Sequence, residues 1–348
     1  MKLKTYVVGN EEKKITTYQF EIYKKNIMFD CGSERLKESD ISNVDFLFIS
    51  HEHLDHWYSL YKLITKFKDD CKIYATETTK MIMLEIVKKE LDRNGANDLI
   101  QKTVIEAFKK INSLIFFKEY CLDDNINVIL YPSGHTFGSS MVYLKTADLK
   151  ILYTGDMDYV VKKENRKYEC PNDLEVDILI VDGTNFLGSD YKTQMINRAA
   201  ENVKDINHIT FNIRTEKAVF LAQHLSEINC LNEHTIIYEG DLKWYLKIIS
   251  EQGYNAFLMN RIVLENKKKP IDDTKKTIRL SSLRYQKYNR DWSFGLHISK
   301  DDVVSFIHQF QTYPKVYFGH YNLENYDEFK ASCDEYKFNL LLAGVNEI

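Results

Sequence analysis

The sequence predicts an α/β fold in two parts. Strand patterns and helical patterns alternate along most of the chain, as they do in α/β proteins. The run Ile178–Val181 is apolar at every position, which is typical of a strand that is buried on both faces. The chain has 348 residues, more than one domain usually contains, so a large domain that carries an insertion is expected.

In the first half, short strand patterns are interrupted by helical spacing. Strands are expected at Lys4–Val8, Tyr18–Tyr23, Asn26–Asp30, Asp45–Ser50, Lys72–Ala75, Leu114–Phe117, Asn127–Tyr131, Met141–Lys145, Lys150–Tyr153 and Val176–Asp182. Helical spacing of apolar residues begins at Leu54 and returns in Thr79–Leu91 and Asp98–Lys110. We therefore expect several strands, with helices between some of them.

In the second half, strands and helices alternate regularly. The expected order is strand His208–Asn212, helix Glu216–Ile228, strand Thr235–Tyr238 and helix Leu242–Glu251. This order is typical of βαβ units and predicts a small parallel sheet. After a lysine-rich loop at Leu264–Lys276, the chain is expected to continue with helix Lys300–Phe310, strand Lys315–Gly319, helix Leu323–Tyr336 and strand Phe338–Leu342.

Composition limits the classes of function. The formal net charge is −4, so the surface as a whole is not suited to gripping nucleic acid, and any such contact must come from a local patch. The six cysteines lie far apart without a CxxC pair, and the N-terminus has no apolar signal segment. No apolar run approaches the length of about 20 residues that a membrane span needs. We expect a cytoplasmic protein that does not associate with membranes.

The segment His51-Glu52-His53-Leu54-Asp55-His56 is the strongest chemical signal, because three histidines and an aspartate follow a hydrophobic strand within six residues. Side chains two positions apart on an extended segment point the same way, so His51 and His53 can share one metal ion. Asp55 and His56 come after the turn into a helix and can face a second ion. Imidazole nitrogen and carboxylate oxygen are common ligands of catalytic Zn²⁺.

Two other strand ends carry candidate ligands. His135 lies in Ser133-Gly134-His135, just after the strand that ends at Tyr131. Asp156 lies in Thr154-Gly155-Asp156, just after the strand that ends at Tyr153. We expect His135 to complete the shell of the first metal and the Asp156 carboxylate to bridge both ions.

These motifs, together with Asp30, resemble in their order the motifs of the metallo-β-lactamase superfamily. The resemblance implies an αββα sandwich with two Zn²⁺ at one sheet edge, and it implies that Asp30 orients the loop that carries the histidine cluster. Mn²⁺ or iron could take the place of zinc, since sites of His and Asp accept several metals.

Three later residues resemble motifs of the β-CASP branch, whose known members are RNA- and DNA-processing nucleases. Asp182 in Val181-Asp182-Gly183-Thr184 resembles the acid, His297 the first histidine and His320 the second histidine of that branch. The resemblance implies that His320 is the last ligand of the second metal. It divides the chain into a first part of the metallo-β-lactamase domain at 1–184, an inserted β-CASP-like domain at 185–292 and a last part at 293–348.

The resemblance implies a zinc-dependent phosphodiesterase that cleaves RNA with a water activated by two metals. In this scheme Asp55 orients the nucleophile or accepts its proton, and His297 protonates the leaving oxygen. Arg214, Arg279 and Arg284 are candidates for contact with the substrate, because guanidinium groups suit the geometry of phosphate.

Other functions remain open at this point. A DNA nuclease of the same branch is one, although a histidine at position 320 favours RNA, because relatives that act on DNA typically have valine there. A small-molecule hydrolase of esters, lactones or thioesters agrees with the net charge of −4, but His297, His320 and the insertion argue against it. A partner protein that keeps the fold without catalysis is another alternative. Assembly with itself or with another protein is left open.

Overall fold

The computed structural model describes residues 1–7, 15–158, 168–187, 191–205, 208–212, 215–227, 234–239, 242–254, 262–263, 276–281, 297–321 and 326–348. The chain separates into two units: unit 1 comprises Met1–Gly188 and His297–Ile348, and unit 2 comprises Ser189–Leu296. Unit 2 therefore interrupts unit 1 in the sequence. The predicted division at 184/185 and 292/293 into domains of named families stays a prediction.

The first sheet of unit 1 has seven strands in the order β18-β1-β2-β3-β4-β5-β6. They are β1 (Lys2–Val7), β2 (Ile15–Ile22), β3 (Lys25–Phe29), β4 (Phe46–Phe48), β5 (Lys72–Ala75), β6 (Asn112–Ser113) and β18 (Gly344–Glu347). The strands from β3 to β6 are parallel, whereas β18, β1, β2 and β3 pair in antiparallel fashion. The two ends of the chain meet at this sheet, where the Ile348 N–H donates to the Met1 carbonyl at 2.9 Å.

The second sheet of unit 1 also has seven strands, in the order β17-β16-β11-β10-β9-β8-β7. They are β7 (Tyr120–Asp123), β8 (Ile126–Pro132), β9 (Ser140–Lys145), β10 (Lys150–Tyr153), β11 (Ile178–Asp182), β16 (Lys315–Gly319) and β17 (Asn339–Leu340). The strands β10, β11, β16 and β17 are parallel, while β7, β8, β9 and β10 pair in antiparallel fashion. As a result β8 runs in the same direction as β10.

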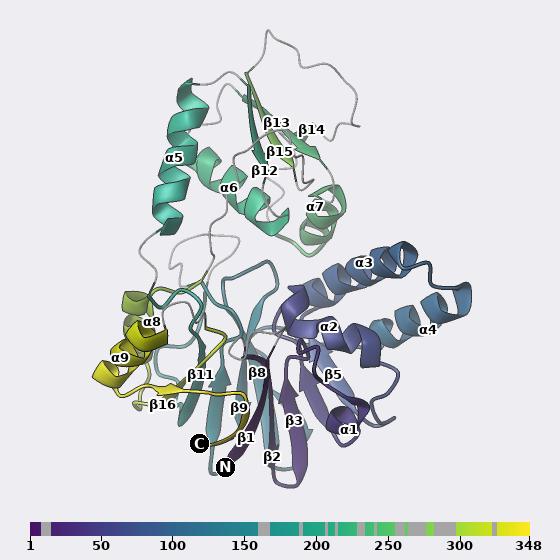
Figure 1. Ribbon diagram of the computed structural model, residues 1–348, viewed down its shortest axis with the longest axis vertical. Helices are drawn as coiled ribbons and strands as arrows, with labels where there is room; N and C mark the ends of the chain where they lie inside the picture. The colour runs from purple at the N-terminus through teal and green to yellow at the C-terminus, as the bar shows by residue number, and fades with distance from the viewer. Residues whose placement is uncertain are drawn as a thin grey trace. The chain divides into compact units, whose positions relative to one another are not determined.

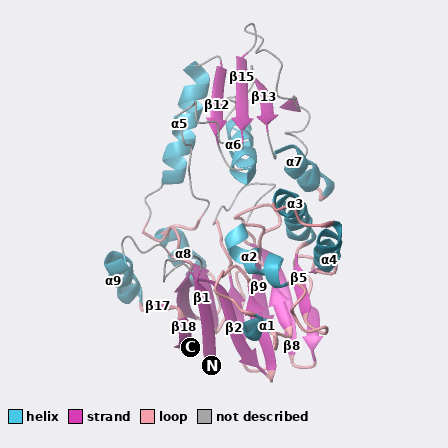
Figure 2. Cartoon of the chain, turned by 45° about the vertical axis from the view of Figure 1, so that its right-hand side comes forward, coloured by secondary structure: helices cyan, strands magenta, loops and turns pink. Residues whose placement is uncertain are grey.

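The two sheets pack face to face, and helices cover their outer faces (Figures 1 and 2). In β11, Ile178 and Ile180 join the core between the sheets, whereas Leu179 and Val181 pack beneath α8 (Lys300–His308) and α9 (Tyr326–Tyr336). This alternation confirms that the strand is buried on both faces. Each such buried side chain contributes about 1.5–3 kcal/mol.

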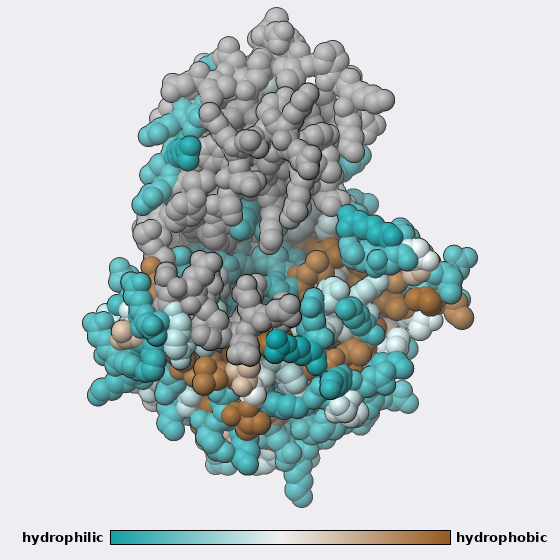
Figure 3. Space-filling model, viewed as in Figure 1, coloured by the Kyte–Doolittle hydropathy of each residue, from teal (hydrophilic) through white to brown (hydrophobic). Residues whose placement is uncertain are grey.

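The outer face of the first sheet packs against α1 (Glu38–Ile41), α2 (Leu54–Leu63), α3 (Glu77–Arg93) and α4 (Asp98–Lys109). The side chain of Trp57 from α2 is fully buried in this layer and stacks edge-on against Phe108 of α4. Unit 1 thus has the layers helix, sheet, sheet and helix, so the predicted αββα fold is confirmed. On the face of unit 1 that Figure 3 shows, most of the coloured surface is hydrophilic, with hydrophobic patches near the α3–α4 pair. Leu99 and Ile100 of α4 are exposed.

Unit 2 contains a four-stranded parallel sheet in the order β12-β15-β13-β14, which confirms the predicted small parallel sheet. Its strands are β12 (His208–Asn212), β13 (His234–Glu239), β14 (Ile262–Val263) and β15 (Lys276–Ser281), and its helices are α5 (Tyr191–Asp205), α6 (Thr215–Glu227) and α7 (Leu242–Glu251). The helix α5 was not predicted, because few of its residues are strongly apolar. Among the α5 residues whose side chains are described, Ala199, Ala200 and Val203 are buried.

Several other predictions need correction. The strand predicted at Leu114–Phe117 is wrong: β6 ends before it, and Phe117 has a φ of +63°, which a strand does not allow. The predicted last strand shrinks to the two residues of β17. Residues 264–275 of the predicted lysine-rich loop lie outside the described residues, and Lys276 already belongs to β15. Among the helices that the structure describes, none has the length and apolar character that crossing a bilayer would demand.

Candidate metal centre

The polar side chains predicted as ligands all follow strand ends. The His51–His56 segment comes after β4, with His53 at the N-cap of α2 and both Asp55 and His56 in its first turn. His135, Asp156 and His320 follow β8, β10 and β16. Because these three strands run in the same direction, their carboxyl ends lie at one edge of the second sheet.

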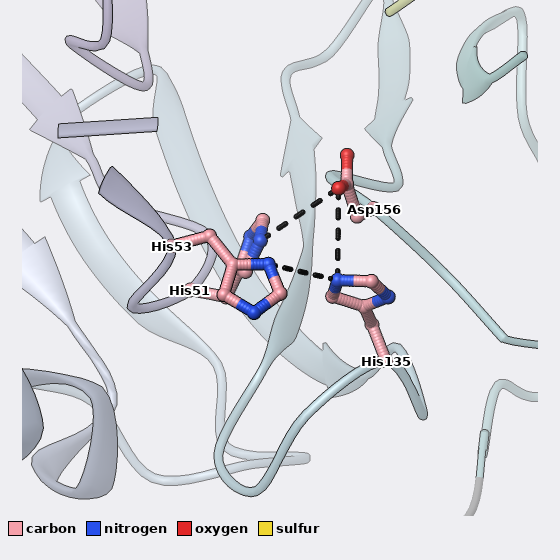
Figure 4. Close-up of side chains that lie close together, drawn as sticks. All are labelled: His51, His53, His135 and Asp156. Atoms are coloured by element: carbon pink, nitrogen blue, oxygen red, sulfur yellow. Dashed lines mark hydrogen bonds and ion pairs between the residues drawn. The ribbon is translucent and has the colours of Figure 1, made fainter. Parts of the chain in front are cut away.

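A first group comprises His51, His53, His135 and Asp156, whose potential ligand atoms all lie within 4.8 Å of one another (Figure 4). The His135 Nε2 atom is 3.1 Å from His53 Nδ1 and 3.6 Å from Asp156 Oδ2. The His51 Nε2 atom is 3.8 Å from the same carboxylate oxygen. The four side chains thus surround one small volume.

A second group comprises Asp55, His56 and His320. The His320 Nε2 atom is 3.6 Å from Asp55 Oδ2. The other oxygen of Asp156, Oδ1, lies 3.3 Å from His56 Nε2 and 2.6 Å from His320 Nδ1. The Asp156 carboxylate therefore faces the first group with one oxygen and the second group with the other.

A third group comprises Asp156, Asp182 and His297. The His297 Nδ1 atom is 2.8 Å from Asp182 Oδ2 and 3.8 Å from Asp156 Oδ2. Thr184, which the sequence reasoning did not single out, ties this group to His320. Its N–H donates to Asp182 Oδ1 at 2.9 Å and its hydroxyl to the His320 carbonyl at 2.8 Å.

The buried nitrogens of these groups test whether the site suits metal ions. The Nε2 atoms of His51, His56 and His320 are buried, and within the described part of the chain none of them has a hydrogen-bond partner. Buried polar atoms without partners are costly, so native proteins rarely keep them without a function. The Nε2 atoms of His51 and His56 face the Asp156 carboxylate, and that of His320 faces the Asp55 carboxylate. Imidazole nitrogens beside carboxylates are a set of donors that a divalent cation such as Zn²⁺ would satisfy.

The electrostatics of the site differ between the two groups. Burial lowers the pKa of His51 and His135 well below its usual value, so these rings favour the neutral form that binds metals. Burial also acts to lower the pKa of His56 and His320, but the adjacent carboxylates outweigh it. The pKa of His56 is raised well above its ordinary value, and that of His320 is raised to about 9. The positive charges of His320 and His56 in turn outweigh burial at Asp156 and hold its pKa well below the usual range.

Asp30 was predicted to orient the loop that carries the histidine cluster. Its side chain is fully buried and accepts hydrogen bonds from the Ser50 N–H at 2.7 Å and from the Tyr153 hydroxyl at 2.6 Å. It also contacts His56 Nδ1 at 2.7 Å and the Ser50 hydroxyl at 2.7 Å. This geometry fits the predicted role. Sequence reasoning missed Ser50 and Tyr153, because neither residue type signals a metal site by itself.

The arginines predicted to contact substrate cannot be placed in the site. Arg214 and Arg284 lie outside the described residues, and Arg279 lies in β15 with a side chain outside the described part. Their role stays a prediction.

Comparison with known proteins agrees with this geometry. Residues 20–165 match the family model described as "Metallo-beta-lactamase superfamily domain". This segment, which is less than half of the chain, is thus similar to metallo-β-lactamase superfamily domains. The match implies a site for divalent metal, and the three groups of His and Asp side chains are where such a site would lie.

The chain is also similar to several proteins that are named as ribonucleases or as a cleavage and polyadenylation factor. It is 29% identical over 180 residues to an RNase J-like protein of Methanocaldococcus jannaschii, which covers 51% of this chain and 41% of that protein. It is 28% identical over 176 residues to the cleavage and polyadenylation specificity factor subunit 3 of Dictyostelium discoideum, covering 46% of this chain and 23% of that protein. It is 27% identical over 203 residues to the endoribonuclease ysh1 of Aspergillus fumigatus, and this match covers 53% of this chain and 23% of that protein.

The chain thus spans less than half the length of these relatives. A crystal structure of a protein of unknown function from Enterococcus faecalis V583 shares the fold. The TM-score is 0.53 at 16% sequence identity, and the match covers 95% of this chain and 91% of that one.

Proposed function

We propose that this chain is a metal-dependent phosphodiesterase that cleaves RNA and holds two Zn²⁺ ions. The observation that carries the proposal is the position of Asp156, whose two carboxylate oxygens face two separate groups of ligand-type side chains. His51, His53 and His135 would hold one ion, Asp55, His56 and His320 the other, and Asp156 would be shared. Mn²⁺ or iron would suit the same donors.

Two such ions, when bound, supply a water nucleophile at neutral pH and stabilise charge on the phosphate oxygens. The protein must then orient that nucleophile and move protons. The Asp55 side chain is 27% exposed, so it can reach both the site and an incoming substrate. We assign Asp55 to orienting the water or accepting its proton.

His297 is assigned to protonating the leaving oxygen. Its Nδ1 atom is held by Asp182 at 2.8 Å, which leaves Nε2 as the ring nitrogen that can face a substrate. The side chain is 16% exposed, whereas Asp182 is buried, so His297 can meet the leaving group while Asp182 holds its orientation. Asp182 is thus a positioning residue in this scheme.

The choice of RNA rests on the relatives, whose names include an RNase J-like protein and an endoribonuclease. A DNA nuclease with the same centre is the alternative that the test must separate. Contact of Arg214, Arg279 and Arg284 with phosphate, a cytoplasmic location and assembly with itself or another protein stay predictions.

The test combines metal analysis with cleavage of matched 5′-labelled single-stranded RNA and DNA. The wild type is expected to bind two metal ions per chain and to cleave RNA in preference to DNA. His53→Ala and Asp156→Asn should abolish cleavage while keeping the far-ultraviolet circular dichroism of the wild type. His308→Ala, which changes an exposed histidine of α8, serves as the control and should keep full activity.

Full activity of either ligand variant after chelation and return of zinc would contradict the ligand assignment. Preferential cleavage of DNA would contradict the choice of RNA while leaving the metal centre intact.

A further inference from the structure

Ser50, the residue before the histidine cluster, is almost fully buried between parts of the centre. Its hydroxyl oxygen lies 2.7 Å from Asp30 Oδ2 and 3.0 Å from His51 Nδ1. Its carbonyl accepts hydrogen bonds from the N–H of Ser140 at 2.8 Å and from the Ser140 hydroxyl at 3.1 Å. The Ser50 hydroxyl therefore lies within hydrogen-bond distance of both Asp30 and His51.

The single proton of this hydroxyl determines how the three groups must bond. The carboxylate of Asp30 has only acceptor sites, and it already receives the Ser50 N–H and the Tyr153 hydroxyl. If the Ser50 proton pointed at His51 instead, two oxygens would face each other at 2.7 Å with no hydrogen between them. The hydroxyl must therefore donate to Asp30, and it offers His51 only a lone pair.

His51 must then donate its Nδ1–H to Ser50, which leaves Nε2 as the bare nitrogen of the neutral ring. Nε2 is also the atom that lies 3.8 Å from Asp156 Oδ2, on the side of the first group. The hydrogen bonds on one side of the ring thus prepare the nitrogen on the other side to bind a metal.

We propose that Ser50 is a positioning residue for metal binding. Its hydroxyl group links Asp30 to His51 by hydrogen bonds, a relay that fixes the tautomer of the His51 ring. The proposal rests on the metal centre assigned under the proposed function, but not on the identity of the substrate. Asp30 contacts His56 of the second group directly, at 2.7 Å, and reaches His51 of the first group through Ser50. One buried carboxylate thereby orients a histidine in each ligand group.

Packing holds the relay in place. Gly155, one residue before Asp156, has a φ of +56°, and a Cβ atom added to it would lie 2.6 Å from the Ser50 Cβ and 2.8 Å from its hydroxyl oxygen. The backbone that delivers Asp156 therefore packs directly on the Ser50 side chain. Such outer-shell contacts restrict ring orientation as well as the tautomer.

The tautomer can be measured without metal or substrate. The sample is the ¹⁵N-labelled, metal-free full chain, and its two-bond proton–nitrogen spectrum reports the histidine rings. The signals of His51 are those that disappear in His51→Gln. They should show a ring that is protonated at Nδ1 and bare at Nε2. In Ser50→Ala, the His51 ring should no longer prefer the tautomer that is protonated at Nδ1. A His51 ring protonated at Nε2 in the wild type would overturn the proposal even if the variant failed to fold.

Zinc affinity supplies a second readout, by competition with a chromophoric chelator. Ser50→Ala should lower the affinity for one of the two zinc ions by about 10–100-fold, which is the usual effect of removing a residue that hydrogen-bonds to a metal ligand. Ser140→Ala, which removes a buried hydroxyl on the other side of Ser50, should leave both affinities unchanged.

Equal zinc affinities in the wild type and Ser50→Ala would overturn the relay, whatever the wild type cleaves. A wild type that shows the expected tautomer and affinities but cleaves no RNA would instead overturn the proposed function and leave the relay standing.

Discussion

Replacement of Gly32 by alanine tests how closely the scaffold controls the second ligand group. Gly32 is buried beside the start of α2, and a Cβ atom added to it would lie 1.6 Å from the Asp55 carbonyl oxygen and 2.8 Å from the His56 nitrogen. The neighbouring Cys31 N–H donates to the His56 carbonyl at 2.7 Å, so the two segments are bonded to each other as well as packed. The new methyl group must therefore push the first turn of α2 away.

The size of the displacement can be worked out from these distances. Ordinary contact begins at 3.4 Å, so the Asp55 oxygen would have to retreat by about 1.8 Å in a close-packed interior. Misplacement of a catalytic group by about 1 Å can cost a factor of about 100 in rate. We expect Gly32→Ala to lower the rate of RNA cleavage at least about 100-fold and to lower the affinity for one metal ion. The overpacking should also lower the free energy of unfolding by about 1–3 kcal/mol.

The assay measures urea unfolding, metal ions per chain and the initial cleavage rate on the same preparations. Gly95→Ala is the matched control. A Cβ atom there would meet nothing within 4 Å, but a φ of +63° strains any residue other than glycine. The control should lose stability to a similar degree while keeping both metals and the cleavage rate. A Gly32→Ala protein with wild-type metal content and a wild-type cleavage rate would show that Gly32 does not control the position of the second ligand group.

Two further predictions concern hydrogen bonds away from the proposed ligand atoms. Thr136→Val should lower the free energy of unfolding in urea by about 1–3 kcal/mol, because the Thr136 hydroxyl donates to the buried Glu52 carboxylate at 2.6 Å. The control is Thr16→Val, since the Thr16 hydroxyl is buried and has no hydrogen-bond partner among the described residues. Lys68→Met should lower the unfolding free energy by about 1 kcal/mol or less near neutral pH, since Lys68 Nζ pairs with Asp45 Oδ1 at 2.6 Å.

The effect of Lys68→Met should depend on pH. Burial acts to raise the pKa of Asp45, but hydrogen bonds from Lys68 and from the Asn26 N–H outweigh it and lower the pKa below the ordinary 3.8. The stabilisation is therefore present above pH 3.8 and is lost as the pH falls through the lowered value. The pKa of Lys68 is raised above 10.5 by the hydrogen bond to Asp45, so the stabilisation is also lost as the pH rises through that raised value.

The matched control is Lys66→Met, which removes an exposed pair with Glu38 and should change little at any pH. A difference between wild type and Lys68→Met that stays constant from acid to alkaline pH would contradict the account. A Thr136→Val protein that is as stable as Thr16→Val would contradict the role given to the Glu52 bond.

Features that depend on local spacing could be predicted from the order of the residues alone. The apolar run of β11 could be predicted because burial on both faces requires apolar residues at every position. The His51–His56 segment could be singled out because ligand residues lie close together in it and follow a strand. The short length of β17 and the turn at Phe117 could not be predicted, because their apolar residues are the same ones that would fit longer strands.

The contacts between distant side chains follow from the folding of the chain and could not be predicted from spacing. The structure places His135, Asp156 and His320 beside the histidine cluster and shows that the two oxygens of Asp156 face different groups. It also shows the contacts of Ser50 with Asp30 and of Thr184 with His320. Such contacts join residues far apart in the chain, and a serine or threonine forms them only where packing brings a buried partner within about 3 Å. Residue type and spacing carry no record of that proximity.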